Sequence, residues 1–141
     1  MKARLFDASS IMLLVKRYPE KTSIILEGEY LLDLTMYEVG NVIWKINKLI
    51  NKSDKSTALD AIEQAYNLTA LMEVIKIEGV EEFKNTMRIA FEGGLSFYDS
   101  AYLHTAGRKG LTLVSEDDRL SKRAMEFGVN CITITDIASE V

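Results

Sequence analysis

Residues 111–120, LTLVSEDDRL, combine a predicted strand with the start of a predicted helix. This stretch starts with a short apolar run, residues 111–114, that suits a buried β-strand. A serine and three acidic residues follow this run, and residues 118–127 then read as a helix that stops at Gly128. A strand that leads straight into a helix is the repeating unit of a parallel sheet covered on both faces.

The same alternation of strands and helices extends outward over the whole chain, without a repeat or a linker. Strands are predicted at residues 2–6, 30–34, 74–77, 111–114 and 131–134. Helices are predicted at residues 10–17, 19–26, 35–51, 80–91, 96–108 and 118–127, and one more begins after Ser53. We therefore predict an α/β fold, a three-layer α/β/α sandwich with a mostly parallel central sheet, in which residues 1–141 form a single domain.

Local signals define the ends and faces of several of these helices. Pro19 is expected in the first turn of its helix, and Ser53 is expected to cap the helix that follows it. Apolar residues at helical spacing are Leu59, Ile62, Tyr66 and Met72 in the helix after Ser53, and Val80, Phe83, Met87 and Phe91 in the helix at 80–91.

Composition and charge restrict the functions that the chain can have. Hydrophobic residues make up 48% and charged residues 27%, and the single cysteine, Cys131, excludes an intramolecular disulfide. No apolar run approaches the ~20 residues of a membrane span, so we expect a cytoplasmic protein with no membrane partner. The net charge is −4. A protein that binds nucleic acid by charge alone is usually basic, so binding of RNA would need metal ions or a local basic patch.

Four acids are expected at one edge of the predicted sheet. Asp7 and Asp117 follow strands, and Glu38 and Asp99 lie in the first turns of helices. Each acid alone also has a structural interpretation, because TMYE at 35–38 is a capping box and SFYD at 96–99 nearly matches one. However, all four can face the mouth where an open parallel sheet binds its ligands. Four carboxylates there would repel one another unless cations lay between them.

This set of acids indicates metal-ion chemistry on a phosphate ester. An oxygen-only set of ligands favours Mg²⁺, or Mn²⁺, over zinc. Metal ions of this kind can activate a water and stabilise the leaving oxygen of an in-line displacement. The single histidine, His104, and Cys131 are interpreted as structural residues.

Four ordered segments make the sequence resemble a PIN-domain nuclease. They are FDASSI at 6–11, YEVGNVI at 37–43, GLSFYDSAY at 94–102 and LVSEDDRL at 113–120. In length and layout the chain is most similar to the VapC-type toxins of VapBC toxin–antitoxin pairs. The resemblance implies a Mg²⁺-dependent endoribonuclease that a small antitoxin inhibits and that commonly forms a homodimer.

By the same resemblance, Asp7, Glu38 and Asp99 would be metal ligands, and Asp117 a fourth acid that acts directly or through water. Ser9 and Ser115 would support these acids by hydrogen bonds. Ser115 stands where the family more often has threonine, and the adjacent Asp118 could substitute for Asp117. Asp33, also near the mouth, is interpreted as solvated.

Basic and apolar side chains suggest where partners bind. Contacts to RNA phosphates are predicted for Arg108, Lys109, Arg119, Lys122 and Arg123, although exposed helix ends often carry such residues without a ligand. Most apolar residues at 13–15 and in the helix at 35–51 are expected to belong to the core, and some are in excess of it. This excess could form a dimer interface or a groove for an antitoxin helix, with Trp44 as the best anchor.

Three other functions fit parts of the same pattern. A PIN nuclease could process RNA without an antitoxin, and a PIN-fold module could bind a partner without catalysis. A Mg²⁺-dependent phosphatase or phosphoacceptor domain would need a lysine at a strand end, and the sequence offers only the hydroxyl of Ser115.

Overall fold

A five-stranded, all-parallel sheet forms the centre of the computed structural model, which describes residues 3–141. The strand order is β3-β2-β1-β4-β5. The strands are β1 (Arg4–Phe6), β2 (Tyr30–Leu32), β3 (Glu73–Ile75), β4 (Thr112–Val114) and β5 (Cys131–Ile132). The predicted fold class is therefore confirmed. Lys2, which the sequence analysis assigned to the first strand, lies outside the described residues.

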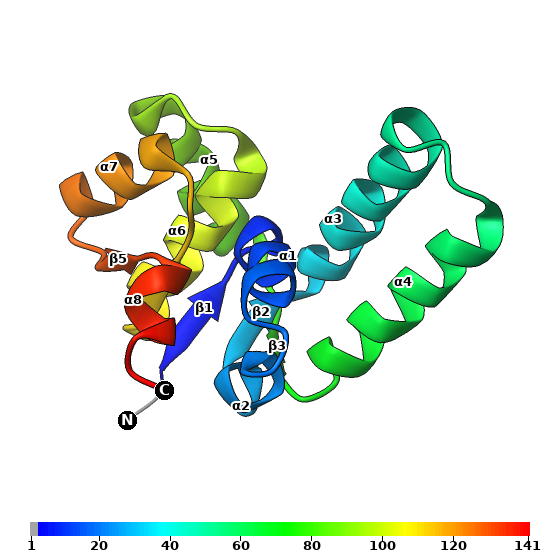
Figure 1. Ribbon diagram of the computed structural model, residues 1–141. Coiled ribbons are helices and arrows are strands. Elements are labelled where there is room, and N and C mark those ends of the chain that lie inside the picture. Colours follow the sequence, from blue (N-terminus) through cyan, green and yellow to red (C-terminus); the bar gives the residue numbers. More distant parts are fainter. Residues whose placement is uncertain (1–2) are drawn as a thin grey trace.

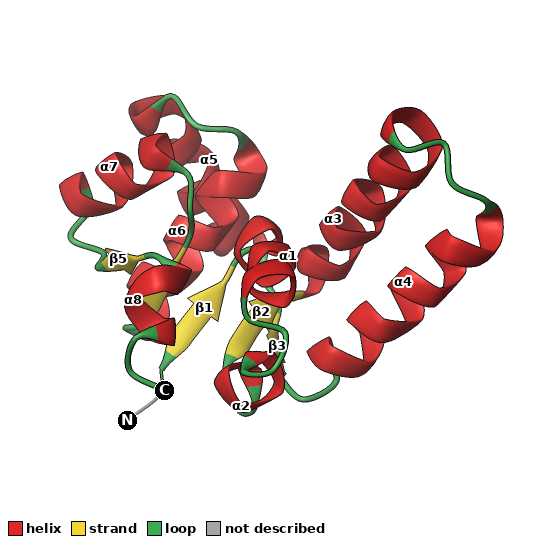
Figure 2. Cartoon of the chain, in the orientation of Figure 1, coloured by secondary structure: helices red, strands yellow, loops and turns green. Residues whose placement is uncertain are grey.

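Helices cover both faces of this sheet (Figure 2). They are α1 (Ala8–Arg17), α2 (Thr22–Leu26), α3 (Asp33–Trp44), α4 (Lys55–Thr69), α5 (Val80–Gly93), α6 (Phe97–Lys109), α7 (Asp118–Glu126) and α8 (Ile134–Ala138), and a π-helical segment η1 (Lys45–Ile50) continues α3. No helix within residues 3–141 is long and apolar enough to cross a membrane.

Neighbouring residues of the strands supply two separate cores, because successive side chains of a strand point to opposite faces. On one face, the α6 and α7 helices pack against Leu5, Leu32 and Leu113. On the other face, α1, α2 and α8 pack against Phe6, Leu31 and Val114. These short strands are apolar on both faces, which is why the sequence shows runs rather than alternation.

The α3 and α4 helices form an arm that extends away from the sheet (Figure 1). A third, smaller core holds the base of this arm against α1, and it contains Ala8, Val39, Ile43 and Ala65. The arm carries one of the four acids, Glu38, and a surface that faces α1.

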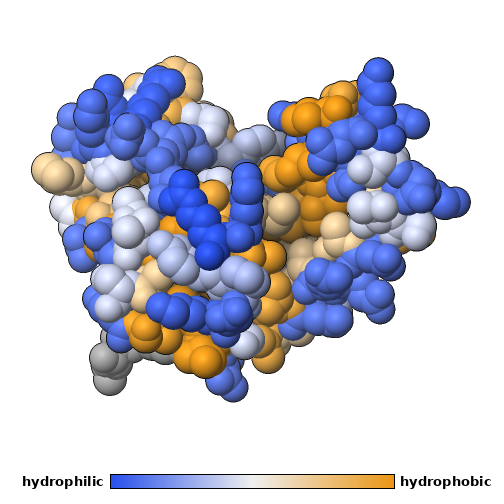
Figure 3. All heavy atoms as spheres, in the orientation of Figure 1, coloured by the Kyte–Doolittle hydropathy of each residue, from blue (hydrophilic) through white to orange (hydrophobic). Residues whose placement is uncertain are grey.

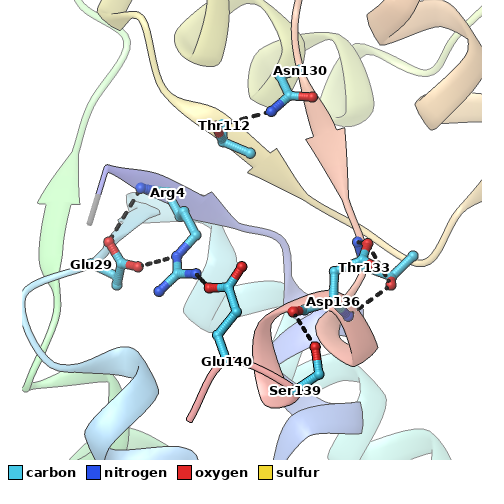
Figure 4. Close-up of polar contacts among 8 residues, drawn as sticks. All are labelled: Arg4, Glu29, Thr112, Asn130, Thr133, Asp136, Ser139 and Glu140. Atoms are coloured by element: carbon cyan, nitrogen blue, oxygen red, sulfur yellow. Dashed lines mark hydrogen bonds and ion pairs between the residues drawn. The ribbon is translucent and has the colours of Figure 1, made fainter. Parts of the chain in front are cut away.

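A buried ion pair fixes the end of the sheet opposite the acids (Figure 4). Glu29, fully buried just before β2, accepts hydrogen bonds from the Arg4 backbone and from the Arg4 guanidinium. Arg4 also lies 3.7 Å from Glu140, which follows α8. This pair joins β1 to β2 and to the C-terminal helix.

Several helices begin at other residues than the sequence predicted. The α2 helix begins at Thr22, and Pro19 lies in the preceding turn. The α3 helix begins at Asp33, so Asp33 is an exposed helical residue and not part of a strand. The cap of α4 is Asp54, whose side chain accepts the Thr57 amide at 2.9 Å, and not Ser53.

Two predicted apolar faces are exposed in part or in full. Of the face predicted for α4, Leu59 and Tyr66 are exposed, whereas Ile62 packs against the third core and Met72, just after the helix, is buried. Within α4 itself, Ala65 and Thr69 are the buried residues. In α5, the stripe consists entirely of exposed residues: Val80, Phe83, Met87 and Phe91. Periodicity identified each stripe but not whether another element covers it. The C-terminal α8 helix was not predicted, and β5 ends at Ile132 because Thr133 caps α8.

Candidate active site

The carboxyl ends of β1 and β4 form the switch point of this sheet, where an α/β fold binds its ligands. The chain runs from β1 to β2 and β3 on one side, and later to β4 and β5 on the other. Asp7 directly follows β1, and residues 115–117 follow β4.

Asp7 is almost fully buried and is held by the start of α1. Its Oδ1 atom accepts the Ser10 amide at 2.9 Å and the Ser9 hydroxyl at 3.3 Å. Burial raises the pKa of this carboxyl, and hydrogen bonds from Ser115, Ser10 and Ser9 oppose that rise. Ser9 and Ser115 therefore contact the acid that they were predicted to support.

Glu38 lies in the second turn of α3 and is bound by a tyrosine from α6. The Tyr102 hydroxyl donates to Glu38 Oε1 at 2.6 Å, and it lies 2.7 Å from the Thr35 hydroxyl. Thr35 Oγ1 in turn accepts the Leu32 amide at 3.1 Å. Thr35 is thus an N-terminal residue inside α3, and Glu38 does not cap this helix. Burial, together with the charges of Asp7 and Asp99, raises the pKa of Glu38.

Asp99 and Asp117 both lie at helix N-termini but differ in how their side chains are used. The Ser96 hydroxyl caps α6 by accepting the Asp99 amide at 3.0 Å, so the Asp99 carboxylate is not the cap. Asp117 is itself the cap of α7, and its Oδ1 accepts the amides of Arg119 and Leu120 at 2.9 and 3.1 Å. Its backbone N–H donates to Ser115 Oγ at 3.2 Å.

The four acids lie close enough to affect one another's charge. Burial raises the pKa of Asp99, and the charges of Asp117 and Asp7 raise it further. Asp7 and Asp99 in turn contribute to the raised pKa of Glu38. The charge of Asp117 acts on Asp99, which favours Asp117 over the adjacent Asp118 as the fourth member of the cluster.

The cluster fits a hard divalent cation by its chemistry. Within the described residues, no group of three Asp, Glu, His or Cys side chains is arranged to hold a metal ion. Mg²⁺, however, keeps several waters and is usually bound by one or two carboxylates. Mutually repelling carboxylates with no nitrogen or sulfur ligand therefore match Mg²⁺ better than the closed tetrahedral site of zinc.

The predicted phosphate-binding residues separate into three groups. Arg108 and Lys109 end α6, and Arg108 lies roughly 13 Å along the helix from Asp99. Arg108 also pairs with Glu82 at 3.3 Å. Lys122 is exposed on α7.

Arg119 and Arg123, the remaining two, bind the turn before α6. Arg123 Nε donates to the Gly93 carbonyl at 2.7 Å, and an Arg119 Nη2 hydrogen bond reaches the Gly94 carbonyl. Arg119 also lowers the pKa of Asp99 by its charge. These contacts join α7 to the turn that directly precedes α6, the helix that carries Asp99.

Some residues follow their structural interpretation, and others were missed. His104 is buried, and its Nε2 lies 3.2 Å from Glu82 Oε1, between α5 and α6. Cys131 is half-buried in β5. Tyr102 was not among the predicted site residues. A possible signal was its position three residues after Asp99, which places both on one face of α6.

Comparisons with known proteins agree with this architecture. The chain is 32% identical over 116 residues to the protein named Exonuclease VapC9 of Pyrobaculum aerophilum, covering 82% of this chain and 81% of that protein. It is 27% identical over 95 residues to Ribonuclease VapC3 of the same organism, covering 65% and 68%. No family model matches the chain.

Solved structures share the fold over nearly the whole chain. The crystal structure of PAE2754 from Pyrobaculum aerophilum superposes with a TM-score of 0.81 at 27% identity, covering 99% of this chain and 94% of the other. A toxin–antitoxin complex from Klebsiella pneumoniae gives a TM-score of 0.60 at 15% identity, covering 84% and 90%, and this match shows the fold alone.

The sheet order, the covering helices and the acids at the switch point define a PIN-domain nuclease. Within that class, the chain belongs to the VapC family, the nuclease toxins of VapBC systems. Nucleases of this family generally depend on a metal ion.

Proposed function

We propose that this nuclease is a Mg²⁺-dependent endoribonuclease that hydrolyses phosphodiester bonds of RNA in the cytoplasm, with Mn²⁺ as an alternative ion. The observation that carries the proposal is the convergence of Asp7, Glu38, Asp99 and Asp117, three of which have raised pKa values because of burial and, for two of them, the charges of the other acids. Such a cluster is stabilised by a divalent cation, and this cation is what hydrolysis of a phosphate diester needs.

In this mechanism the four acids would hold the ion, and hydrogen bonds from neighbouring residues orient three of them. When bound, the ion supplies an activated water and stabilises charge on the leaving 3′-oxygen. Ser9 and Ser10 fix one oxygen of Asp7, and Tyr102 fixes one oxygen of Glu38. The amides at the start of α7 fix Asp117. Attack of water on phosphorus then breaks the bond to the 3′-oxygen, which leaves as the 3′-hydroxyl after it gains a proton.

The proposed regulator is a small antitoxin that lays a helix between α1 and α3. A groove of about 480 Å³ lies there, lined by the apolar side chains Met12, Leu13, Val15, Val42 and Ile46 and by the charged Lys16 and Glu116 at its edges. Figure 3 shows apolar side chains gathered on the arm beside this hollow. An amphipathic helix with apolar residues at i, i+3, i+4 and i+7 suits such a groove.

A homodimer is the proposed assembly of the free protein. Trp44 at the end of α3 is 52% exposed, and Leu49 in η1 is also exposed. Aromatic side chains are enriched among the residues that contribute most to interfaces, so Trp44 is the proposed anchor. The alternative to the toxin–antitoxin pair is a nuclease that has no antitoxin. Copurification of the chain with a protein encoded upstream would favour the pair.

Cleavage of a circular single-stranded RNA by the purified chain tests the catalytic proposal. An endonuclease opens the circle in Mg²⁺, whereas the exonuclease suggested by the name of VapC9 acts only on a linear RNA of the same sequence. Asp99→Asn should reduce cleavage by about 100-fold or more, since even residues that only orient metal ligands contribute about 10–100-fold.

The matched control for this experiment is Asp33→Asn, because Asp33 is an exposed acid at the start of α3, outside the cluster. This variant should cleave as the wild type does. Cleavage that persists in chelator, or that survives Asp99→Asn, would contradict the proposed function.

A further inference from the structure

A pocket of about 520 Å³ opens directly beside the acid cluster. It is lined by Leu34, Tyr37, Glu38, Asn41, Val42 and Tyr98. Its volume lies within the roughly 300–1,000 Å³ of pockets that hold small organic ligands. Because Glu38 belongs both to this pocket and to the cluster, a group bound in the pocket lies next to the atoms that react.

Two tyrosines from different helices contribute to this pocket and are not part of the core. Tyr37 on α3 is 81% exposed, and Tyr98 on α6 is 62% exposed. Each directly precedes an acid of the cluster, Glu38 or Asp99. Tyr102, by contrast, is a buried tyrosine whose hydroxyl has two partners. Exposed rings at the rim of a pocket are available for stacking.

The overall charge makes stacking important for this protein. Nucleic acid binding through phosphate contacts alone depends on many Lys and Arg side chains. This chain has a net charge of −4, and its acid cluster repels phosphates when no cation is bound. Besides a bound cation and the predicted basic contacts, affinity for a nucleic acid would therefore gain from contacts that do not depend on charge.

We propose that this pocket binds one unpaired nucleobase of the substrate, next to the phosphate that is cleaved. Tyr37 and Tyr98 stack on the base, and the Asn41 amide is available for hydrogen bonds to its edge. The inference rests on the proposed nuclease function and specifies its substrate as single-stranded, since a base within a duplex is already stacked on both sides. Sequence preference should be modest, because every base has a face that can stack.

Binding measurements on the inactive Asp99→Asn protein test this pocket without cleavage. The probe is a fluorescently labelled single-stranded RNA oligonucleotide in Mg²⁺ buffer, and the readout is its Kd from anisotropy. Tyr37→Ala and Tyr98→Ala, each added to Asp99→Asn, should raise the Kd by about 5- to 100-fold, whereas Tyr37→Phe and Tyr98→Phe keep the ring and should change it by less than about threefold.

The matched control is Tyr66→Ala, which removes an exposed tyrosine from α4, outside the pocket. It should leave the Kd within about twofold of the parent value. All these side chains are exposed, so circular dichroism should show each variant folded. A set of oligonucleotides with one abasic position each should contain one position that weakens binding to the parent but not to Tyr37→Ala.

The pocket and the proposed function can fail separately. Unchanged Kd values for both alanine variants, or equal binding of duplex and single strand, would overturn the nucleobase pocket even if the wild type cleaves RNA. Absence of cleavage by the wild type, with a tyrosine-dependent Kd, would instead overturn only the nuclease mechanism proposed above.

Discussion

Glu38 is the acid with the most elaborate support, because a chain of hydrogen bonds connects it to the sheet. The Leu32 amide donates to Thr35, whose hydroxyl lies beside that of Tyr102, and Tyr102 donates to Glu38. Burial and the adjacent Glu38 raise the pKa of Tyr102, so its hydroxyl keeps the proton that it donates. Removing this hydroxyl frees Glu38 to rotate without changing the charge of the cluster.

Tyr102→Phe is therefore expected to weaken Mn²⁺ binding by about 10–100-fold, as substitutions of residues that orient metal ligands do. Isothermal titration calorimetry measures this affinity directly and does not depend on cleavage. Thr35→Ser keeps a hydroxyl in the chain and should bind Mn²⁺ almost as the wild type does. An unchanged Mn²⁺ affinity in Tyr102→Phe would show that the hydroxyl does not position Glu38.

Metal affinity should also depend strongly on pH. The pKa values of Asp7, Glu38 and Asp99 are raised, so these carboxyls hold protons at a pH where ordinary carboxyls are ionised. A metal ion binds the ionised form and must displace those protons. Mn²⁺ affinity should thus rise with pH through the range between the ordinary carboxyl pKa and the raised one, with protons released on binding.

Calorimetry in buffers of different ionisation enthalpy counts the protons released. Asp99→Asn removes one charged neighbour of Glu38, so the pH dependence of the remaining affinity should shift to lower pH. A Mn²⁺ affinity that is the same across this range would contradict the raised pKa values.

The individual acids could be predicted from the sequence, whereas the side chains that position them through long-range hydrogen bonds could not. Asp7 and Asp117 follow apolar runs, a local signal that needs no tertiary structure. The contact between Tyr102 and Glu38 spans 64 residues, and that between Arg123 and Gly93 spans 30. Such pairs depend on how helices pack, which a local pattern does not encode.

At the scale of elements, the turn between α5 and α6 places Asp99, and α7 holds this turn. Gly94 ends α5 with a φ of +62°, which a residue with a side chain rarely adopts. The Gly93 and Gly94 carbonyls then accept hydrogen bonds from Arg123 and Arg119. The guanidinium groups thereby lie near the negative end of the α5 dipole, which stabilises them.

Arg123→Ala should lower the free energy of unfolding by about 1–2 kcal/mol, because the partly buried Gly93 carbonyl loses a charged donor. Thermal unfolding measures this loss. Lys122→Ala, a neighbouring exposed cation on α7, is the matched control and should leave the melting temperature unchanged. If Arg123→Ala keeps the wild-type stability but weakens RNA binding, Arg123 contacts the substrate instead of the turn.

The sequence predicted where helices form better than it predicted which of their side chains are buried. The periodic stripe of α5 correctly indicated a helix, yet its apolar side chains are exposed in the described chain. The α3 helix starts at Asp33 and not at Thr35, because the Thr35 hydroxyl accepts a hydrogen bond from the Leu32 amide. A capping-box pattern in the sequence does not distinguish this arrangement from a helix that starts at Thr35.

At the scale of the whole molecule, the acid cluster destabilises the metal-free fold at neutral pH. A carboxyl whose pKa is raised by folding binds its proton more tightly in the folded state than in the unfolded state. The free energy of unfolding therefore falls as the pH rises from the ordinary carboxyl pKa through the raised one. Above that range the cost of the ionised cluster is present in full.

Asp99→Asn should consequently raise the melting temperature in chelator at neutral pH, by a few degrees, because it removes one half-buried charge from the cluster. Mg²⁺ should stabilise the wild type, and it should stabilise Asp99→Asn less. Differential scanning calorimetry with and without Mg²⁺ measures both effects. A lower melting temperature for Asp99→Asn in chelator would contradict this account of the cluster.

The alternation of strands and helices predicted the class of fold, but it did not predict the order of the strands in the sheet. Strands separated by helices predict a parallel sheet. Nothing in the local pattern specifies that β1 lies between β2 and β4, and it is this order that creates the switch point beside Asp7. The arm of α3 and α4 was equally hidden, because its apolar residues resemble those of any core helix.

Val42 borders both the groove beside α1 and the pocket beside Glu38. One side chain of α3 thus separates the surface proposed for a regulator from the surface proposed for the substrate. A regulator would not need to contact the acids to inhibit the enzyme. A small rotation of α3 would move Tyr37 and Glu38 together, away from the other three acids. The position of α3 would then determine both inhibition by the regulator and binding of the substrate.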